Sequence, residues 1–218
     1  MSQPQQQGYG RWEPPFFTAV WAFLLSQDVS FHSQLKQLSH PSLWVNRIVA
    51  FNGFIIDHAL WLMSGLAALL AFAILKGRSS AVGRCCCDVL GVYFAARMLI
   101  QLLGLNILVF DTVSSHFILI TQLLFFLPYS LMLWGWIYWR LDRMGQTHGR
   151  SFFRVDHDSE HPRPIDYFVA SFSTVFSASI SNIKGTSARS RIIILFHGFM
   201  IYDIMGLTFS RAVALVQR

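Results

Sequence analysis

The stretch FSTVFSASISNIKGTSARSR, residues Phe172 to Arg191, decides how this chain is interpreted. It is short and rich in hydroxyl side chains. An amphipathic segment that starts at Asp166-Tyr167 precedes it, and a long apolar run follows it. A polar segment in this position is either a loop at the membrane surface or part of a structure that enters the membrane.

The residues that lead into this stretch predict a short helix from Ile165 to Phe176. Aromatic residues recur every four positions, at Phe168, Phe172 and Phe176, which places them on one helix face. Twelve helical residues rise only about 18 Å, which is too short for a span but suits a re-entrant half-helix.

A re-entrant helix must turn back inside the membrane, and the backbone of its turn needs polar partners there. The residues predicted to form this pore-like turn are Ser177, Ser179, Ile180, Ser181 and Asn182. The alternative is a helix at the membrane surface followed by a serine-rich loop.

Composition indicates a membrane protein that crosses the bilayer several times. The chain has 218 residues, of which 54% are hydrophobic and 13% charged, with 20 Phe and 7 Trp. The net charge of +6 is therefore taken as a topology signal, and no nucleic-acid-binding module is present in the sequence. The polar first 15 residues are predicted to be a disordered tail without the features of a signal or transit peptide.

Apolar runs predict four membrane spans, since a span needs about 20 residues. They are Asp57 to Leu75, Val89 to Leu108, Phe117 to Trp139 and Ile192 to Val216. Two further segments, Phe16 to Leu25 and Leu43 to Ile56, suit helices that lie in the membrane interface. The predicted fold is an all-α membrane protein in four parts: a tail (1–15), interfacial helices (16–56), a transmembrane hairpin (57–108) and a pore-loop-like module (109–218).

The order span, short amphipathic helix, polar turn, final span resembles the pore module of the tetrameric cation-channel superfamily, with SASIS in the place of the filter. Residues 125–216 also resemble an uncharacterised family of bacterial membrane proteins related to two-helix pore-loop channels. The matching motifs are Tyr138-Trp139-Arg140-Leu141-Asp142-Arg143-Met144-Gly145, Asp166-Tyr167, Ser171-Phe172 and Ser210-Arg211-Ala212-Val213.

The resemblance implies a channel-like protein, with departures at the filter. Ser179 and Ser181 stand where potassium channels have glycines, and Asn182 stands at the family's acidic position. Glycine allows the left-handed backbone that points filter carbonyls inward, so potassium selectivity is not implied. The expectation is a weakly selective cation pore formed by an oligomer, most simply a tetramer. The alternative is a non-conducting accessory or scaffold subunit of a larger membrane complex.

Two arguments predict opposite orientations in the membrane. Eleven basic residues fall on the side that holds Lys76, Arg78, Arg84 and the segment from Arg140 to Arg191, which places that side in the cytoplasm. The channel resemblance instead places the filter loop outside. The expected location is the inner (plasma) membrane of a bacterium, with an organellar inner membrane as the alternative.

Two charged residues lie inside predicted spans, Arg97 and Asp203. Charges in a membrane usually face a partner or water. The favoured interpretation is a structural Arg97–Asp203 pair, and the alternative is the lining of an ion path. Asp203 shares a helical stripe with Gly206 and Ser210, which could face a pore or a neighbouring helix.

Other reactive residue types are expected to have no catalytic or metal-binding role. His148, His157 and His161 lie near Asp156, Asp158 and Glu160 in a segment expected to be solvated. Cys85-Cys86-Cys87 match no zinc spacing and form either a helix start or a palmitoylation site. Ser190-Arg191 with His197 resembles one motif of membrane lipid phosphatases, but the companion motifs are missing. The sequence therefore predicts no enzyme, no metal and no cofactor.

Overall fold

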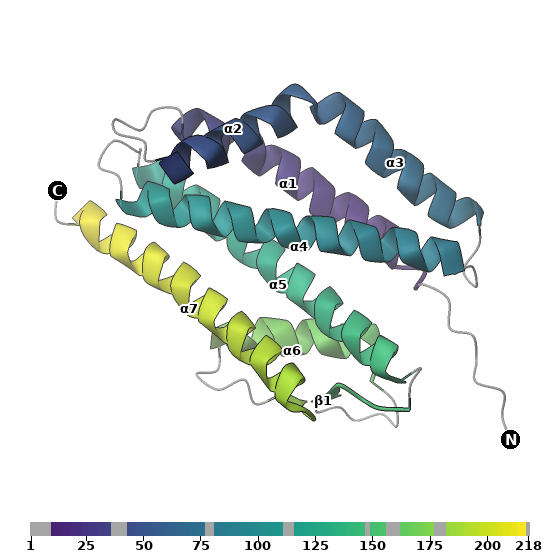
Figure 1. Cartoon of the computed structure of the whole chain (residues 1–218). Helices are drawn as coiled ribbons and strands as arrows, with labels where there is room; N and C mark the ends of the chain where they lie inside the picture. Colours follow the sequence, from purple (N-terminus) through teal and green to yellow (C-terminus); the bar gives the residue numbers. More distant parts are fainter. Residues whose placement is uncertain are drawn as a thin grey trace, which may run out of the picture. The chain divides into compact units, whose positions relative to one another are not determined.

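The computed structural model describes residues 10–35, 43–76, 81–110, 116–146, 149–155, 162–176 and 182–216. The chain divides into two compact units, Met1–Ser114 and Ser115–Arg218. The first unit holds helices α1 (Glu13–Leu35), α2 (Leu43–Asp57), α3 (Ala59–Leu75) and α4 (Ala81–Phe110) (Figure 1). The second holds α5 (His116–Gln146), β1 (Phe153–Val155), α6 (Pro164–Phe176), β2 (Ile183–Gly185) and α7 (Ala188–Val216).

Three helices in the described residues are long and apolar enough to cross a membrane, or up to four if α2 and α3 form one bent span. The three are Ala81–Leu108, Ile120–Gln146 and Ala188–Ser210. They overlap three of the four predicted spans, so the prediction of long apolar helices in these regions is confirmed. The predicted span from Asp57 to Leu75 corresponds to α3, which has 17 residues and counts as a fourth span only together with α2, from which it is bent by 67°.

Helix α4 is the packing partner of α1, α2 and α3 in the first unit. The buried rings of Phe17 on α1 and Phe94 on α4 stack with centroids 5.8 Å apart. Further along, α1 approaches α4 so closely that a side chain at Gly104 would collide with the Phe31 ring. The contact with α4 thus extends along most of α1. This helix has 23 residues, whereas the sequence predicted only the segment from Phe16 to Leu25. Its second half was missed because its polar residues pack inside the unit.

Helix α6 runs antiparallel to the second half of α5. The buried Ser171 Oγ donates a 2.8 Å hydrogen bond to the carbonyl of Leu131, and Phe168 covers Gly135 one turn further along α5. The side of α6 that faces α5 carries Tyr167, Ala170 and Ser171, which are buried. The other side carries Ile165, Val169 and Phe172, which are 60%, 56% and 36% exposed. The predicted aromatic face is thus divided: Phe168 packs against α5, whereas Phe172 lies at the surface.

A two-stranded antiparallel sheet departs from the all-α prediction. Phe153 pairs with Gly185, and Val155 pairs with Ile183. Phe153, Val155 and Ile183 are all buried, so this small sheet contributes apolar side chains to the unit. Of the predicted pore-like turn, Ser177, Ser179, Ile180 and Ser181 lie outside the described residues. Asn182 is half-buried and immediately precedes β2.

Gly135→Ala is expected to destabilise the second unit by about 1–3 kcal/mol because the core there has no room for an added group. An added Cβ would lie 2.6 Å from Phe168 Cδ1 and 3.0 Å from Phe168 Cα. The matched control is Gly65→Ala in α3, where nothing lies within 4 Å of the added Cβ. That variant should be neutral or gain up to about 1 kcal/mol from helix propensity. Thermal unfolding of both variants in mild detergent measures the difference, and equal stabilities would contradict the close α5–α6 contact.

Candidate functional site

The first candidate site is a group of buried polar side chains in the first unit. Arg97 on α4 is 1% exposed and forms an ion pair with Asp28 of α1. Its other terminal nitrogen, Nη1, donates to Asn52 Oδ1 of α2 at 3.1 Å, and Gln101 Nε2 donates to Asp28 Oδ1 at 3.2 Å. We call these four residues the Asp28–Arg97 cluster. It connects three helices through one arginine, as a buried charge requires.

This cluster corrects the predicted Arg97–Asp203 pair, because the acidic partner of Arg97 is Asp28. Asp203 lies half-buried on α7 in the second unit. Sequence reasoning missed Asp28 because it ended the first apolar segment at Leu25. A signal was nevertheless present, since Leu24, Asp28 and Phe31 are spaced by four and three residues and so share one helix face.

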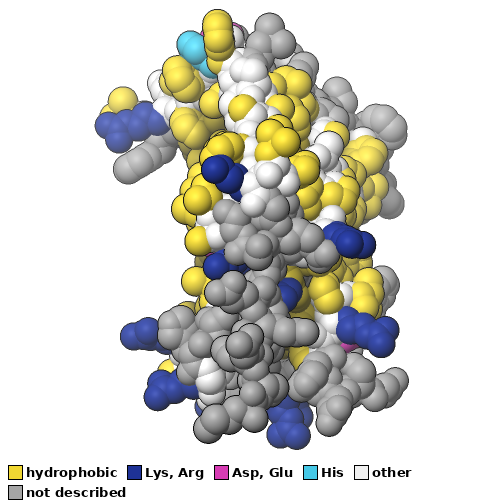
Figure 2. All heavy atoms as spheres, turned by 90° about the vertical axis from the view of Figure 1, so that its right-hand side faces the viewer, with side chains coloured by type: hydrophobic (Ala, Val, Ile, Leu, Met, Phe, Trp, Pro, Cys, Tyr) yellow, Lys and Arg dark blue, Asp and Glu magenta, His cyan; other side chains and the backbone are white. Residues whose placement is uncertain are grey.

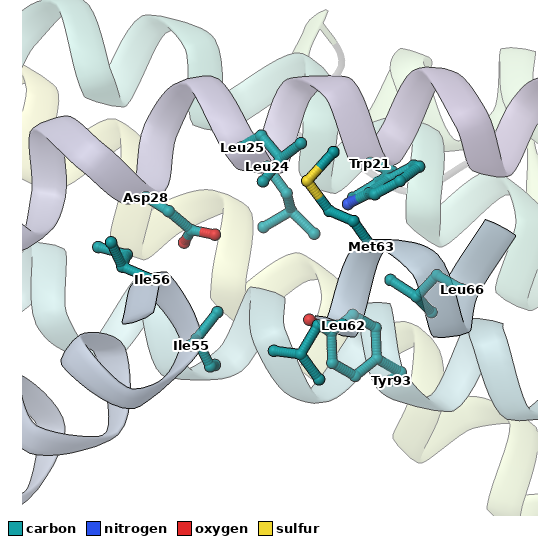
Figure 3. Close-up of a pocket in the computed structure, with 10 residues that line it drawn as sticks. All are labelled: Trp21, Leu24, Leu25, Asp28, Ile55, Ile56, Leu62, Met63, Leu66 and Tyr93. Carbon is teal, nitrogen blue, oxygen red and sulfur yellow. The ribbon is translucent and has the colours of Figure 1, made fainter. Parts of the chain in front are cut away.

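A small pocket of about 60 Å³ lies beside the Asp28–Arg97 cluster (Figure 3). Its walls come from all four helices of the first unit and are mainly aliphatic. The residues that line it are Trp21, Leu24, Leu25, Asp28, Ile55, Ile56, Leu62, Met63, Leu66 and Tyr93. The pocket therefore places one acidic side chain and two aromatic ones against an apolar surface.

The second candidate site is centred on Asp142, which is 1% exposed in the last turns of α5. Asp142 Oδ1 accepts hydrogen bonds from Ser151 Oγ (2.8 Å) and from the backbone N–H groups of Phe152 (2.7 Å) and Phe153 (2.9 Å). Its Oδ2 accepts from Tyr167 Oη (2.6 Å) and Gln146 Nε2 (2.8 Å). This Asp142 cluster ties the end of α5 to β1 and to α6.

The Asp142 cluster brings together two residues of the family-like motif, Asp142 and Tyr167, which are 25 positions apart in the sequence. Burial and the hydrogen bond to Asp142 raise the pKa of the Tyr167 phenol, so it stays protonated and keeps donating. The predicted span ended at Trp139, which left Asp142 outside it. Instead α5 continues to Gln146, and Asp142 is a buried acceptor.

The remaining motif residues have local structural roles where their side chains are described. The Arg143 guanidinium lies 5.2 Å from the ring centre of Trp139, which is buried. Asp166 Oδ2 accepts a hydrogen bond from the backbone N–H of Arg163 (2.6 Å) at the start of α6. Arg211 lies in the last turns of α7.

A buried histidine joins α5 and α7. The Tyr138 hydroxyl lies 2.8 Å from His197 Nδ1, and the Trp134 ring stacks on the His197 imidazole at 4.7 Å. All three side chains are buried, as are Trp136 and Trp139. The aromatic residues at this end of α5 are therefore packed inside the protein.

The motif that resembles lipid phosphatases is spread over separate structural roles. Ser187 and Ser190 cap the start of α7 reciprocally: each backbone N–H donates to the other hydroxyl, at 2.9 and 3.2 Å. Arg191 Nε lies 3.4 Å from the carbonyl of Gly185, its acceptor in β2. His197 is fully buried, as described above.

Ser187→Ala is expected to lower stability by about 1 kcal/mol and to loosen the first turn of α7, because it removes the capping acceptor. Hydrogen exchange of the backbone amides near Ser190 measures this effect. The matched control is Ser210→Ala, which changes an exposed serine near the other end of α7. Faster exchange in both variants, or in neither, would show that the cap does not hold this turn.

Several predicted residues lie elsewhere. Gly206 and Ser210 are exposed on α7, and nothing lies within 4 Å of a Cβ added at Gly206. Cys85 is exposed, Cys86 and Cys87 are buried, and all three are free thiols. The histidines and acidic residues considered for metal binding, His148, Asp156, His157, Asp158, Glu160 and His161, lie outside the described residues.

No family model matches this chain, and no curated protein and no solved structure matches it either.

Proposed function

We propose that this chain is a channel-like integral membrane protein whose second unit, α5 to α7, is a pore-loop module. The observation that carries the proposal is the antiparallel contact of α6 with the second half of α5. Helix α6 has 13 residues and rises about 20 Å, roughly two thirds of a 30 Å hydrocarbon core. A helix of this length that starts level with one end of a span ends inside the membrane.

The contacts of α6 along α5 support this depth. The candidate span in α5 is Ile120–Gln146, and Tyr167 near the start of α6 bonds to Asp142 near the end of that span. One turn further, Ser171 bonds to Leu131, close to the middle of the span. The last residues of α6 therefore lie at mid-membrane depth if α5 crosses the bilayer.

The start of α7 lies at the same end of α5 as the start of α6. The backbone N–H of Thr186 donates to the carbonyl of Phe152 (3.2 Å), and the N–H of Phe152 donates to Asp142. Helix α7 then contains the candidate span Ala188–Ser210. The order candidate span, short helix, candidate span supports the assignment of the second unit as a pore-loop module.

A cation is the favoured ion. The C-terminal end of α6 carries the negative end of the helix dipole, and it leads into the segment with Ser177, Ser179, Ser181 and Asn182. Hydroxyl and amide oxygens can replace part of a hydration shell, but without glycines they give weak selectivity. Several copies of the chain, most simply four, would surround one axis.

The test starts with the mass of the complex after gentle solubilisation from its native membrane. A homotetramer supports the pore and leads to cation flux assays in liposomes. There Ser179→Ala and Ser181→Ala should change the flux, while Ser64→Ala on the exposed face of α3 should not. A single copy in a large heteromeric particle, or a tetramer without flux, would overturn the proposal.

The second candidate function is a non-conducting accessory subunit, and the surface of α7 favours it. Large apolar side chains cover much of this helix and are available for lipid or for partner helices. They are Ile192, Leu195, Phe196, Phe199, Tyr202, Met205, Phe209 and Val213. Figure 2, a view from another side, also shows hydrophobic side chains at the surface, with separate Lys and Arg side chains between them. For this function, Phe199→Ala and Phe209→Ala should release a partner from the purified complex.

A further inference from the structure

We propose that the pocket of the first unit binds a neutral, lipophilic small molecule through a hydroxyl group. The binding site consists of Asp28, Trp21 and Tyr93 on an aliphatic surface (Figure 3). This proposal does not depend on whether the second unit conducts ions.

The first observation is that only one oxygen of Asp28 is used. Asp28 is 6% exposed, and both Arg97 and Gln101 bond to its Oδ1. Among the described residues, Oδ2 accepts no hydrogen bond, although Asp28 lines the pocket. This second oxygen is therefore available to accept a hydrogen bond from a ligand in the pocket, and a hydroxyl group supplies the donor.

The second observation is that two further polar groups line the same pocket. Figure 3 shows the Trp21 indole nitrogen and the Tyr93 hydroxyl turned toward its interior, with the Asp28 carboxylate. Neither group forms a hydrogen bond with another residue in the part of the chain that the structure describes. The hydroxyl group of a ligand can donate a hydrogen bond to Asp28 and accept one from Trp21 or Tyr93. Its donor and its acceptor would then both have partners.

The charge of the site favours a neutral ligand over an amine. Arg97 already balances Asp28, so the cluster carries no net charge. A bound ammonium would leave one uncompensated positive charge in a region of low dielectric constant, which is costly. An alcohol or phenol satisfies Oδ2 without that cost.

The size and walls of the pocket define the rest of the ligand. A cavity volume of about 60 Å³ is several times the roughly 10–15 Å³ that a single water molecule needs by the same measure. It therefore holds the hydroxyl end of a molecule and one or two carbons. The aliphatic walls, which include Leu24, Ile55 and Leu66, suit an apolar remainder that extends toward the lipid.

The experiment uses the full chain in lipid nanodiscs and follows 4,4,4-trifluorobutan-1-ol by fluorine NMR. Saturable line broadening should be seen with the wild-type protein. A probe of similar shape without the hydroxyl, 1,1,1-trifluoropentane, should bind at least about 10-fold more weakly because it leaves Oδ2 without a donor. 4,4,4-Trifluorobutylammonium should also bind more weakly than the alcohol.

Three variants locate the binding. Met63→Trp fills the pocket and should abolish the broadening, whereas Met205→Trp, at an exposed methionine of α7, should leave it unchanged. Tyr93→Phe keeps the shape of the wall and should weaken binding several-fold. If Met63→Trp fails to fold, Leu66→Phe fills the same pocket with a smaller change in volume.

Equal binding of the alcohol and the alkane probe would overturn the proposal, as would broadening that persists when the pocket is filled. Tightest binding of the ammonium probe would also overturn it, because the ligand would then be a cation. Loss of binding in the filled variants, with the alcohol preferred, establishes a hydroxyl-binding site. The result is independent of the mass and flux measurements on the second unit.

Discussion

Arg97→Met is expected to lower the free energy of unfolding by about 3–5 kcal/mol, the usual effect of removing one partner from a buried ion pair. The substitution leaves the Asp28 carboxylate buried without its cation, and Asn52 Oδ1 loses the hydrogen bond from Arg97. Arg97 is 1% exposed, so bulk solvent does not surround the position that the guanidinium leaves. Thermal or denaturant unfolding in mild detergent measures the change.

Two variants separate the ion pair from other effects on α4. Arg84→Met changes a half-buried arginine of the same helix and should shift stability by no more than about 0.5 kcal/mol. The double variant Asp28→Leu/Arg97→Met removes both charges and should recover most of the loss, since apolar replacement of a buried pair is often neutral or stabilising. A double variant as unstable as the single one would show that Arg97 acts by something other than pairing with Asp28.

Asp142→Ala is expected to destabilise the second unit by about 3 kcal/mol or more, because it removes the acceptor of five hydrogen bonds at once. The backbone N–H groups of Phe152 and Phe153 and the hydroxyl of Tyr167 would lose their acceptor. Each buried donor left in this way costs roughly 1–3 kcal/mol, reduced where water can enter. The variant should also allow α6 to separate from the end of α5. Faster limited proteolysis around β1 would detect this separation.

Asp166→Ala is the matched control for Asp142→Ala. Asp166 accepts one backbone hydrogen bond at the start of α6, so its loss should cost only about 1 kcal/mol. Asp142→Asn keeps one acceptor oxygen and should lie between the two. If Asp142→Ala were no less stable than Asp166→Ala, the carboxylate would not be the link between α5, β1 and α6.

The sequence determined the class of this protein and the approximate position of its long helices. A span depends on about 20 consecutive apolar residues, which is a local property. Segments such as Val89 to Leu108 and Phe117 to Trp139 could therefore be placed without knowledge of their neighbours. Arg97 was also recognised as a buried charge that needs a partner, because an arginine inside an apolar run has few alternatives.

The ends of the helices were harder to predict than their centres. Helix α1 continues past Leu25 and α5 continues past Trp139 into polar sequence. Polar residues there are buried because other parts of the chain supply their hydrogen-bond partners, as Arg97 does for Asp28 and Tyr167 does for Asp142. Hydropathy along one segment carries no information about those partners.

Only the tertiary structure decided which residues meet. Arg97 pairs with Asp28, 69 positions away, because α1 packs on α4, and no local pattern distinguishes this aspartate from Asp203. The strands β1 and β2 have three residues each and exist only because they pair across about thirty intervening residues. A membrane span needs only a run of apolar residues that lipid can surround, and this run is visible in the sequence. A buried ion pair or a short strand forms only when folding brings its partner to it.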